Sequence, residues 1–163
     1  MNSQSPHSLR SWPRSPAFVL LALVLAMAPA QAQQQQQPSP QRSKPMKIRL
    51  TLGDTVLTAT LRDNATARDF AAQLPLTLTL TDYAATEKVG DLPRKLTTKG
   101  APEGAAAKAG DIGYYAPWGN LALYHKDFRY SEGVVMLGTL DGGVEALRRP
   151  GPLKVTFERA EEE

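Results

Sequence analysis

The chain has 163 residues, 19 of them basic and 16 acidic, and a formal net charge of +3 at pH 7. It contains no cysteine, which excludes disulfides, a thiol nucleophile and a zinc–thiolate site. This length is typical of one domain with extensions.

The first 32 residues have the pattern of an export signal. Arg10 and Arg14 give a basic start, and the apolar run at residues 17–27 is too short to span a bilayer comfortably. The tripeptide Ala30-Gln31-Ala32 is the small-x-small motif that a signal peptidase cuts. The alternative is a retained membrane anchor; a lipoprotein anchor is excluded because no cysteine follows. We expect residues 1–32 to be a cleaved signal peptide and the protein to be periplasmic or secreted.

The rest of the chain divides into a linker, a domain and a tail. Cleavage removes Arg10 and Arg14 and lowers the net charge from +3 to +1, so the charge is no signature of nucleic-acid binding. Residues 33–45 (QQQQQPSPQRSKP) have no aliphatic side chain to bury, which predicts a disordered Gln/Pro-rich linker. The folded domain is expected over residues 46–159, with an acidic tail at residues 160–163.

Alternating residues predict a hairpin at the start of the domain. Residues 47–52 (KIRLTL) put their apolar side chains on one face, and Gly53-Asp54 can turn the chain into a second strand at residues 55–61. A helix is expected next, with Thr66 and Asp69 as a capping box and Pro75 at its end.

An alternating strand at residues 76–82 comes before a segment without periodicity. Residues 87–110 are rich in glycine, alanine and lysine. This pattern predicts a long connection with one short strand near residues 95–98. Because long ordered loops in compact domains are often functional, we expect this one to border the site.

The second half of the domain predicts another hairpin, a helix and two strands. Residues 111–116 and 121–126 flank the turn PWGN, and residues 134–140 form a continuous apolar strand. A short helix, VEALRR, ends before Pro150, and residues 153–159 close the domain. Seven to eight strands with two short helices predict a mainly β fold, a closed barrel, because closure removes exposed strand edges.

Three segments carry a resemblance to a known family. NATARDFAAQLP resembles the first-helix motif of cyclophilins, GDIGYYAPWGNLALY their glycine-initiated strand, turn and aromatic strand, and GVVMLGTLDGGVEAL the strand, turn and helix that follow. With this order of elements, residues 46–158 resemble the cyclophilin fold and, more closely, the bacterial cyclophilin-like domain proteins. The resemblance implies the barrel and no settled activity.

The same resemblance indicates departures from the prolyl isomerases of this fold. Those enzymes use an arginine on the third strand to hydrogen-bond the prolyl amide, and here that strand, LTLTLTDYAA, contains no arginine or histidine. The family's histidine before its Val-Val-Phe-Gly stretch corresponds to Gly133, and its glutamine on the fifth strand maps near Ala122. Tyr124 is the aromatic residue retained at the proline pocket. One wall of that pocket is therefore implied without its catalytic donor, and no catalytic residue is assigned.

Residues 110–130 hold six of the eleven aromatic side chains and form the candidate binding groove. Period two puts Tyr114 and Tyr115 on opposite faces of their strand, and a tryptophan in a Pro-Trp-Gly-Asn turn favours exposure. Aromatic side chains held on a rigid loop make good binding anchors. The alternative is that these residues fill the core or pack the turn. The candidate ligand-binding residues are Tyr115, Trp118, Asn120, Tyr124, His125 and Arg129.

Other chemistry has little support in the sequence. His125 is the only histidine after residue 32, no acidic cluster accompanies it, and Ser131 falls in an expected turn. We therefore expect no metal site, no cofactor and no Ser-His-Asp triad. Arg129 has a structural alternative, in which it stacks on a neighbouring ring or pairs with Asp127 or Glu132.

Two hypotheses on function remain open. The first is an exported protein that binds a small molecule or a short peptide through the aromatic groove, without catalysis. The second is a prolyl isomerase of exported proteins, which would need Arg94 or Arg129 to reach the groove beside Tyr124. A purely structural role is a third possibility. We expect no nucleic-acid partner, no membrane contact after cleavage, and a monomer or weak dimer.

Overall fold

The first hairpin follows directly from the alternation of its residues. In the computed structural model, which describes residues 45–160, β1 (Lys47–Leu52) pairs antiparallel with β2 (Thr55–Leu61) and buries Ile48 and Leu50. Gly53 makes the turn with a φ of +59°, a backbone conformation that glycine adopts without steric cost. The predicted hairpin is confirmed.

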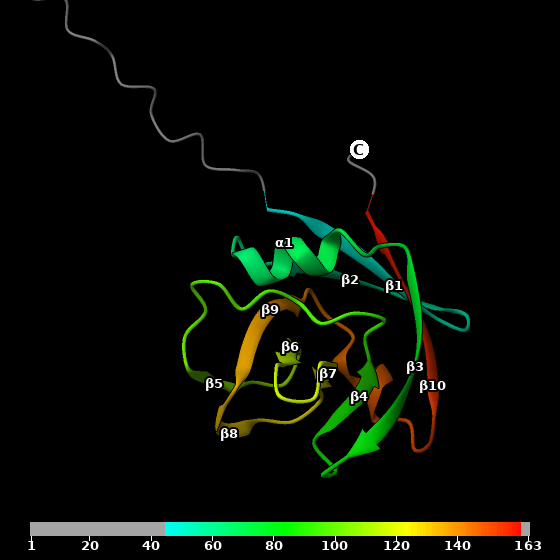
Figure 1. The fold of residues 1–163 in the computed structure, drawn as a ribbon. Helices are drawn as coiled ribbons and strands as arrows, with labels where there is room; N and C mark the ends of the chain where they lie inside the picture. Colours follow the sequence, from blue (N-terminus) through cyan, green and yellow to red (C-terminus); the bar gives the residue numbers. More distant parts are fainter. Residues whose placement is uncertain (1–44, 161–163) are drawn as a thin grey trace, which may run out of the picture. The chain divides into compact units, whose positions relative to one another are not determined.

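Eight antiparallel strands close into a barrel in the order β1–β10–β3–β4–β7–β6–β9–β2 (Figure 1). The last strand pairs with both β1 and β3, so the C-terminal part of the domain completes the wall. This confirms the mainly β closed barrel predicted from the sequence. The strands beyond the first hairpin are β3 (Leu76–Tyr83), β4 (Glu87–Asp91), β6 (Asp111–Tyr115), β7 (Asn120–Tyr124), β9 (Val134–Leu140) and β10 (Leu153–Arg159).

Helix α1 (Ala65–Ala71) begins at a different cap from the one predicted. Its N-cap is Asn64, whose Oδ1 accepts a hydrogen bond from the Ala67 N–H at 2.8 Å and so satisfies a free donor of the first turn. The predicted capping box is wrong. Thr66 lies buried inside the first turn, and the Asp69 carboxylate instead binds Arg94, which lies outside the helix.

Both helical segments pack into the barrel core. Phe70 of α1 contacts Phe157 of β10 edge-on, with ring centroids 6.0 Å apart, and the helix ends at Ala71, before Pro75. The second predicted helix is a short 3-10 segment, η1 (Val144–Arg148), which buries Leu147. Among residues 45–160, no helix has the length and apolar character needed to cross a membrane.

The segment at residues 87–110 contains two strands that the sequence analysis missed. β4 belongs to the barrel, and β5 (Gly104–Ala107) pairs with β8 (Phe128–Glu132) in a separate two-stranded sheet, at the lower left of Figure 1. The prediction of a strand near residues 95–98 is wrong, because the backbone there is irregular. Ser131, expected in a turn, lies in β8.

Two apolar clusters lie on opposite sides of the barrel wall. Leu121 and Leu123 of β7 point into the main core, while Ala122 and Tyr124 of the same strand belong to a smaller outer cluster. The outer cluster also contains Ala107, Val134 and Met136, with Ala105 and Phe128 packed against it. It therefore joins the outer face of β7 and β9 to the β5–β8 sheet. The candidate site lies at the margin of this cluster.

Candidate functional site

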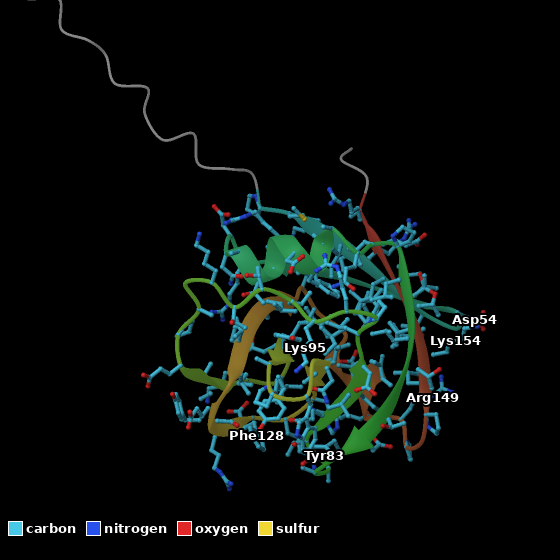
Figure 2. The ribbon with its side chains drawn as sticks, in the orientation of Figure 1. Asp54, Tyr83, Lys95, Phe128, Arg149 and Lys154 are labelled. Atoms are coloured by element: carbon cyan, nitrogen blue, oxygen red, sulfur yellow. The ribbon has the colours of Figure 1, made fainter. Side chains whose placement is uncertain are left out.

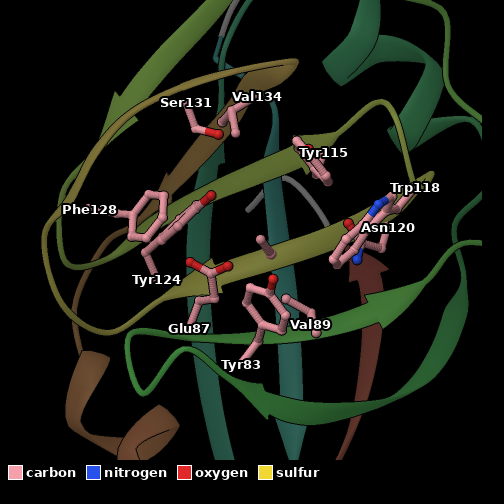
Figure 3. A pocket seen from close by; sticks show the side chains of 11 residues that line it. Tyr83, Glu87, Val89, Tyr115, Trp118, Asn120, Tyr124, Phe128, Ser131 and Val134 are labelled. Carbon is pink, nitrogen blue, oxygen red and sulfur yellow. The ribbon is translucent and has the colours of Figure 1, made fainter.

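A pocket of about 120 Å³ opens on the outer face of the barrel and collects most of the exposed aromatic side chains. We call it the aromatic pocket (Figure 3). Figure 2 shows two of its residues, Tyr83 and Phe128, along the same lower side of the molecule. The residues that line it are Tyr83, Glu87, Val89, Tyr115, Trp118, Asn120, Ala122, Tyr124, Phe128, Ser131 and Val134.

Strand register places a carboxylate between two tyrosines. Glu87 of β4 lies directly opposite Tyr83 in the β3–β4 pair and directly opposite Tyr124 in the β4–β7 pair. Directly opposed residues share one face of a sheet, so the three form a row across the barrel wall. Figure 3 shows the Glu87 carboxylate directed into the pocket between the two rings.

Three rings at nearly right angles form the other end of the pocket. The Trp118 ring lies 5.7 Å from Tyr83 at an interplanar angle of 90°, and 5.3 Å from Tyr115 at 80°. These are favourable edge-to-face contacts, and they leave the faces of different rings turned in different directions. Trp118 is 59% exposed and Tyr83 is 43% exposed, although both are large apolar side chains.

Glu87 is buried without a cationic partner in the pocket lining. Its residue is only 6% exposed, and its side-chain hydrogen bond is a long one, 3.4 Å, from the Thr86 hydroxyl. Burial raises the pKa of the Glu87 carboxyl, because an apolar environment penalises the charged form. No lysine, arginine or histidine is among the described residues that line the pocket.

Burial, and then the negative charge of Glu87, raises the pKa of the Tyr124 hydroxyl. That hydroxyl therefore stays protonated at physiological pH. The Tyr124 ring stacks at a tilt on Phe128, with centroids 6.0 Å apart. This end of the pocket offers an apolar wall with one neutral hydroxyl.

Asn120 adds a polar group that the protein leaves unsatisfied. The residue is 5% exposed, and its Oδ1 accepts no hydrogen bond from the described residues. A buried acceptor without a donor costs free energy. Such a group in a pocket wall is typical of a site where a ligand or water completes the hydrogen bonds.

A fixed turn presents Trp118. The Ala116 N–H donates to the Gly133 carbonyl at 2.9 Å, and Gly119, at a φ of +80°, closes the turn through its N–H to the Tyr115 carbonyl. The alkyl chain of Lys95 packs over Gly119. Of the segment at residues 87–110, which we expected to border the site, Glu87 and Val89 line the pocket. Residues 92–103 do not line it, and Lys95 among them supports the tryptophan turn.

The structure brings together four of the six candidate residues. Tyr115, Trp118, Asn120 and Tyr124 line the aromatic pocket, whereas His125 and Arg129 do not.

Both of the outlying candidates have local surroundings of their own. His125 is buried directly after the end of β7, and its Nδ1 has no partner among the described residues. Burial, followed by the charge of Lys126, lowers the pKa of the His125 imidazole. The Arg129 guanidinium lies 6.0 Å from the centre of the Phe128 ring. Arg94 pairs with Asp69 at 2.5 Å and does not line the pocket.

Sequence reasoning missed Glu87 and Tyr83. The inward positions of β4 are Lys88 and Gly90, so the strand shows no alternation of apolar residues. Lys88 is fully buried and is held by Asp82 at 2.7 Å and by the carbonyls of Arg149 and Gly151. A tyrosine and an acidic residue flank the turn at residues 84–86, in DYAATE, and this spacing is the signal that could have indicated the pair.

Two other kinds of functional site have less support in the structure. A larger cavity of about 450 Å³ is lined by residues that include Pro45, Thr60, Arg62 and Arg68, and no tyrosine or tryptophan is among its described lining residues. Within residues 45–160, no group of three acidic or histidine side chains could hold a metal ion.

Comparisons with known proteins agree with this architecture. The sequence model of the cyclophilin-like family matches residues 50–158. A hypothetical protein from Archaeoglobus fulgidus, whose structure was determined in solution, is similar to this chain with a TM-score of 0.53 and 19% sequence identity, over 75% of this chain and 100% of its own. At that identity the likeness shows the fold alone. No curated protein matches the chain.

Proposed function

The chain belongs to the cyclophilin-like family, and we propose that it uses the barrel of that family to bind a small molecule or a short peptide in the aromatic pocket. One observation carries the proposal: Trp118 and Tyr83 stay exposed, at 59% and 43%, beside a concave site with a buried carboxylate. Large aromatic side chains held in fixed positions supply contact area at low cost in conformational entropy. Ligand pockets combine such surfaces with a few polar groups, as here.

Prolyl isomerisation has less support. Rate enhancement requires a group that stabilises the twisted amide more than the planar one, since an apolar pocket alone binds both equally well. A fixed charged donor would serve, but Arg94 is bound to Asp69, and Arg129 lies outside the lining. Binding without catalysis is therefore the function we favour.

The second part of the proposal is that the protein is exported. We propose that residues 1–32 direct the protein to the periplasm or the medium and are removed after Ala32; they lie outside the described residues. Mass spectrometry of protein isolated from its native host should find Gln33 at the N-terminus. An intact Met1 in the membrane fraction would contradict export by a cleaved signal.

Replacement of Trp118 tests the binding site. A thermal-shift screen of small molecules and short peptides on the purified protein should yield a ligand whose affinity falls by about 1–3 kcal/mol in Trp118→Ala. Tyr130→Ala is the matched control, because Tyr130 is 58% exposed and does not line the pocket. Tyr130→Ala should change stability by less than about 0.5 kcal/mol. Trp118→Ala should cost about 1–3 kcal/mol, because it removes the two edge-to-face contacts with Tyr83 and Tyr115. Unchanged affinity in Trp118→Ala would show that the ligand binds elsewhere.

A further inference from the structure

We propose that the aromatic pocket binds an organic cation, an ammonium or trimethylammonium group, between the aromatic rings and the Glu87 carboxylate. This inference rests on the proposed function, since it names the ligand class of the same pocket. Three properties of the pocket lead to it: the sign of its charge, the arrangement of its rings and its size.

The charge of the pocket is uncompensated. Glu87 is the only acidic residue of the described lining, and no basic side chain accompanies it there. By contrast, Asp82 is paired with Lys88, Asp69 with Arg94 and Asp127 with Lys108. A buried carboxylate is stable in its charged form only with a partner, and here the ligand can supply that partner.

The aromatic rings of the pocket also favour a cationic ligand. The faces of aromatic rings are electronegative and attract ammonium groups within about 6 Å of the ring centre. Trp118, the strongest such ring type, meets Tyr83 and Tyr115 at nearly right angles, so several walls can surround one charged group. Sets of rings arranged as walls are the usual recognition device for quaternary ammonium groups.

The volume limits what can enter. At about 120 Å³ the pocket is well below the roughly 300–1,000 Å³ of sites that enclose drug-sized ligands. A single head group or one side chain fits such a space. The cation can therefore belong to a small molecule or to a methylated or free lysine of a peptide, and the chemistry of recognition is the same.

Two probes of equal shape and different charge test the inference on the purified protein. Choline carries a trimethylammonium group, and 3,3-dimethylbutan-1-ol replaces its nitrogen with carbon and is neutral. By titration calorimetry, choline should bind about tenfold more tightly than the alcohol or better. In Glu87→Gln that preference should shrink severalfold, whereas Glu145→Gln, an equal charge change at an exposed position of η1, should leave it unchanged. An acetylated trimethyllysine amide, run in parallel, separates the sources: tighter binding than choline indicates a peptide, weaker binding a small molecule.

The outcomes separate this inference from the proposed function. Equal affinity for choline and the alcohol, or a preference unchanged in Glu87→Gln, would overturn the inference that the ligand is a cation. The proposal that the pocket binds a ligand would remain. The comparison of the two probes on the unsubstituted protein stands even if a variant folds poorly. Absence of binding by all three probes also overturns the cation inference, and the thermal-shift screen with Trp118→Ala then decides separately whether the pocket binds anything.

Discussion

Glu87 is a buried carboxylate with aromatic rings beside it. It lies between Tyr83 and Tyr124, with the Thr86 hydroxyl as its hydrogen-bond donor and no basic side chain in the pocket lining. Burial therefore raises its pKa above the ordinary value of 4.5. In the empty pocket its charge is a cost to folding, and a bound cation offsets that cost.

The stability of the empty protein should depend on this charge. With a folded-state pKa above the unfolded value, Glu87 binds its proton more tightly in the folded protein, so its contribution to stability is full below about pH 4.5 and is lost as the pH rises through the raised pKa. Glu87→Gln should therefore be more stable than the unsubstituted protein at neutral pH and equal to it in acid. Urea unfolding at several pH values measures this, with Glu145→Gln as the control. A Glu87→Gln protein less stable at pH 7 would contradict the burial of an uncompensated charge.

At the scale of elements, the small outer sheet supports one wall of the pocket. β5 and β8 pair closely because Gly104 has no side chain: a Cβ there would lie 2.8 Å from the Glu132 Cα and would also collide with the Ser131 carbonyl oxygen. Phe128 of β8 packs on Tyr124 across this sheet and the barrel wall. The position of the wall thus depends on a glycine in a strand that carries no aromatic side chain.

Gly104→Ala should separate β5 from β8, disturb the pocket wall that Phe128 forms and destabilise the protein. Overpacking of this kind costs about 1–3 kcal/mol of stability. Gly142→Ala is the control, since nothing lies within 4 Å of a Cβ at that position and its stability should change by less than about 0.5 kcal/mol. Urea unfolding of both variants gives the comparison. Equal stability of the two proteins would mean that the β5–β8 contact is less tight than the structure indicates.

The elements that could be predicted are those whose residues alternate. The leucines of β1 and β3 face the core and give the barrel, as expected. β4 was missed because Lys88 and Gly90 occupy its inward positions, and Gly90 leaves room for Leu80, whose Cδ2 would lie 2.6 Å from a Cβ there. The β3–β4 side of the pocket went unrecognised for the same reason, since Tyr83 and Glu87 meet only through the β3–β4 register.

At the scale of the whole molecule, this chain has the barrel of the cyclophilin-like family, but no lysine, arginine or histidine is among the described residues that line its aromatic pocket. The uncatalysed barrier to prolyl isomerisation is about 18–20 kcal/mol and reflects amide resonance. We predict that the purified protein accelerates isomerisation of a proline peptide less than about twofold, since uniform binding leaves the barrier unchanged. A coupled protease assay with a cyclophilin as positive control measures the rate. A rate near that of the control, lost in Arg94→Ala or Arg129→Ala, would restore the isomerase hypothesis.

We infer that the aromatic pocket, and not the second cavity, holds a cationic ligand. An NMR titration of the isotope-labelled protein with choline tests it most directly, because every backbone amide reports on its own surroundings. We expect saturable shifts concentrated at residues 83–89 and 115–124, and severalfold weaker binding in Glu87→Gln. Shifts centred instead on the second cavity, around Arg62 and Arg68, or the absence of any saturable shift, would contradict it.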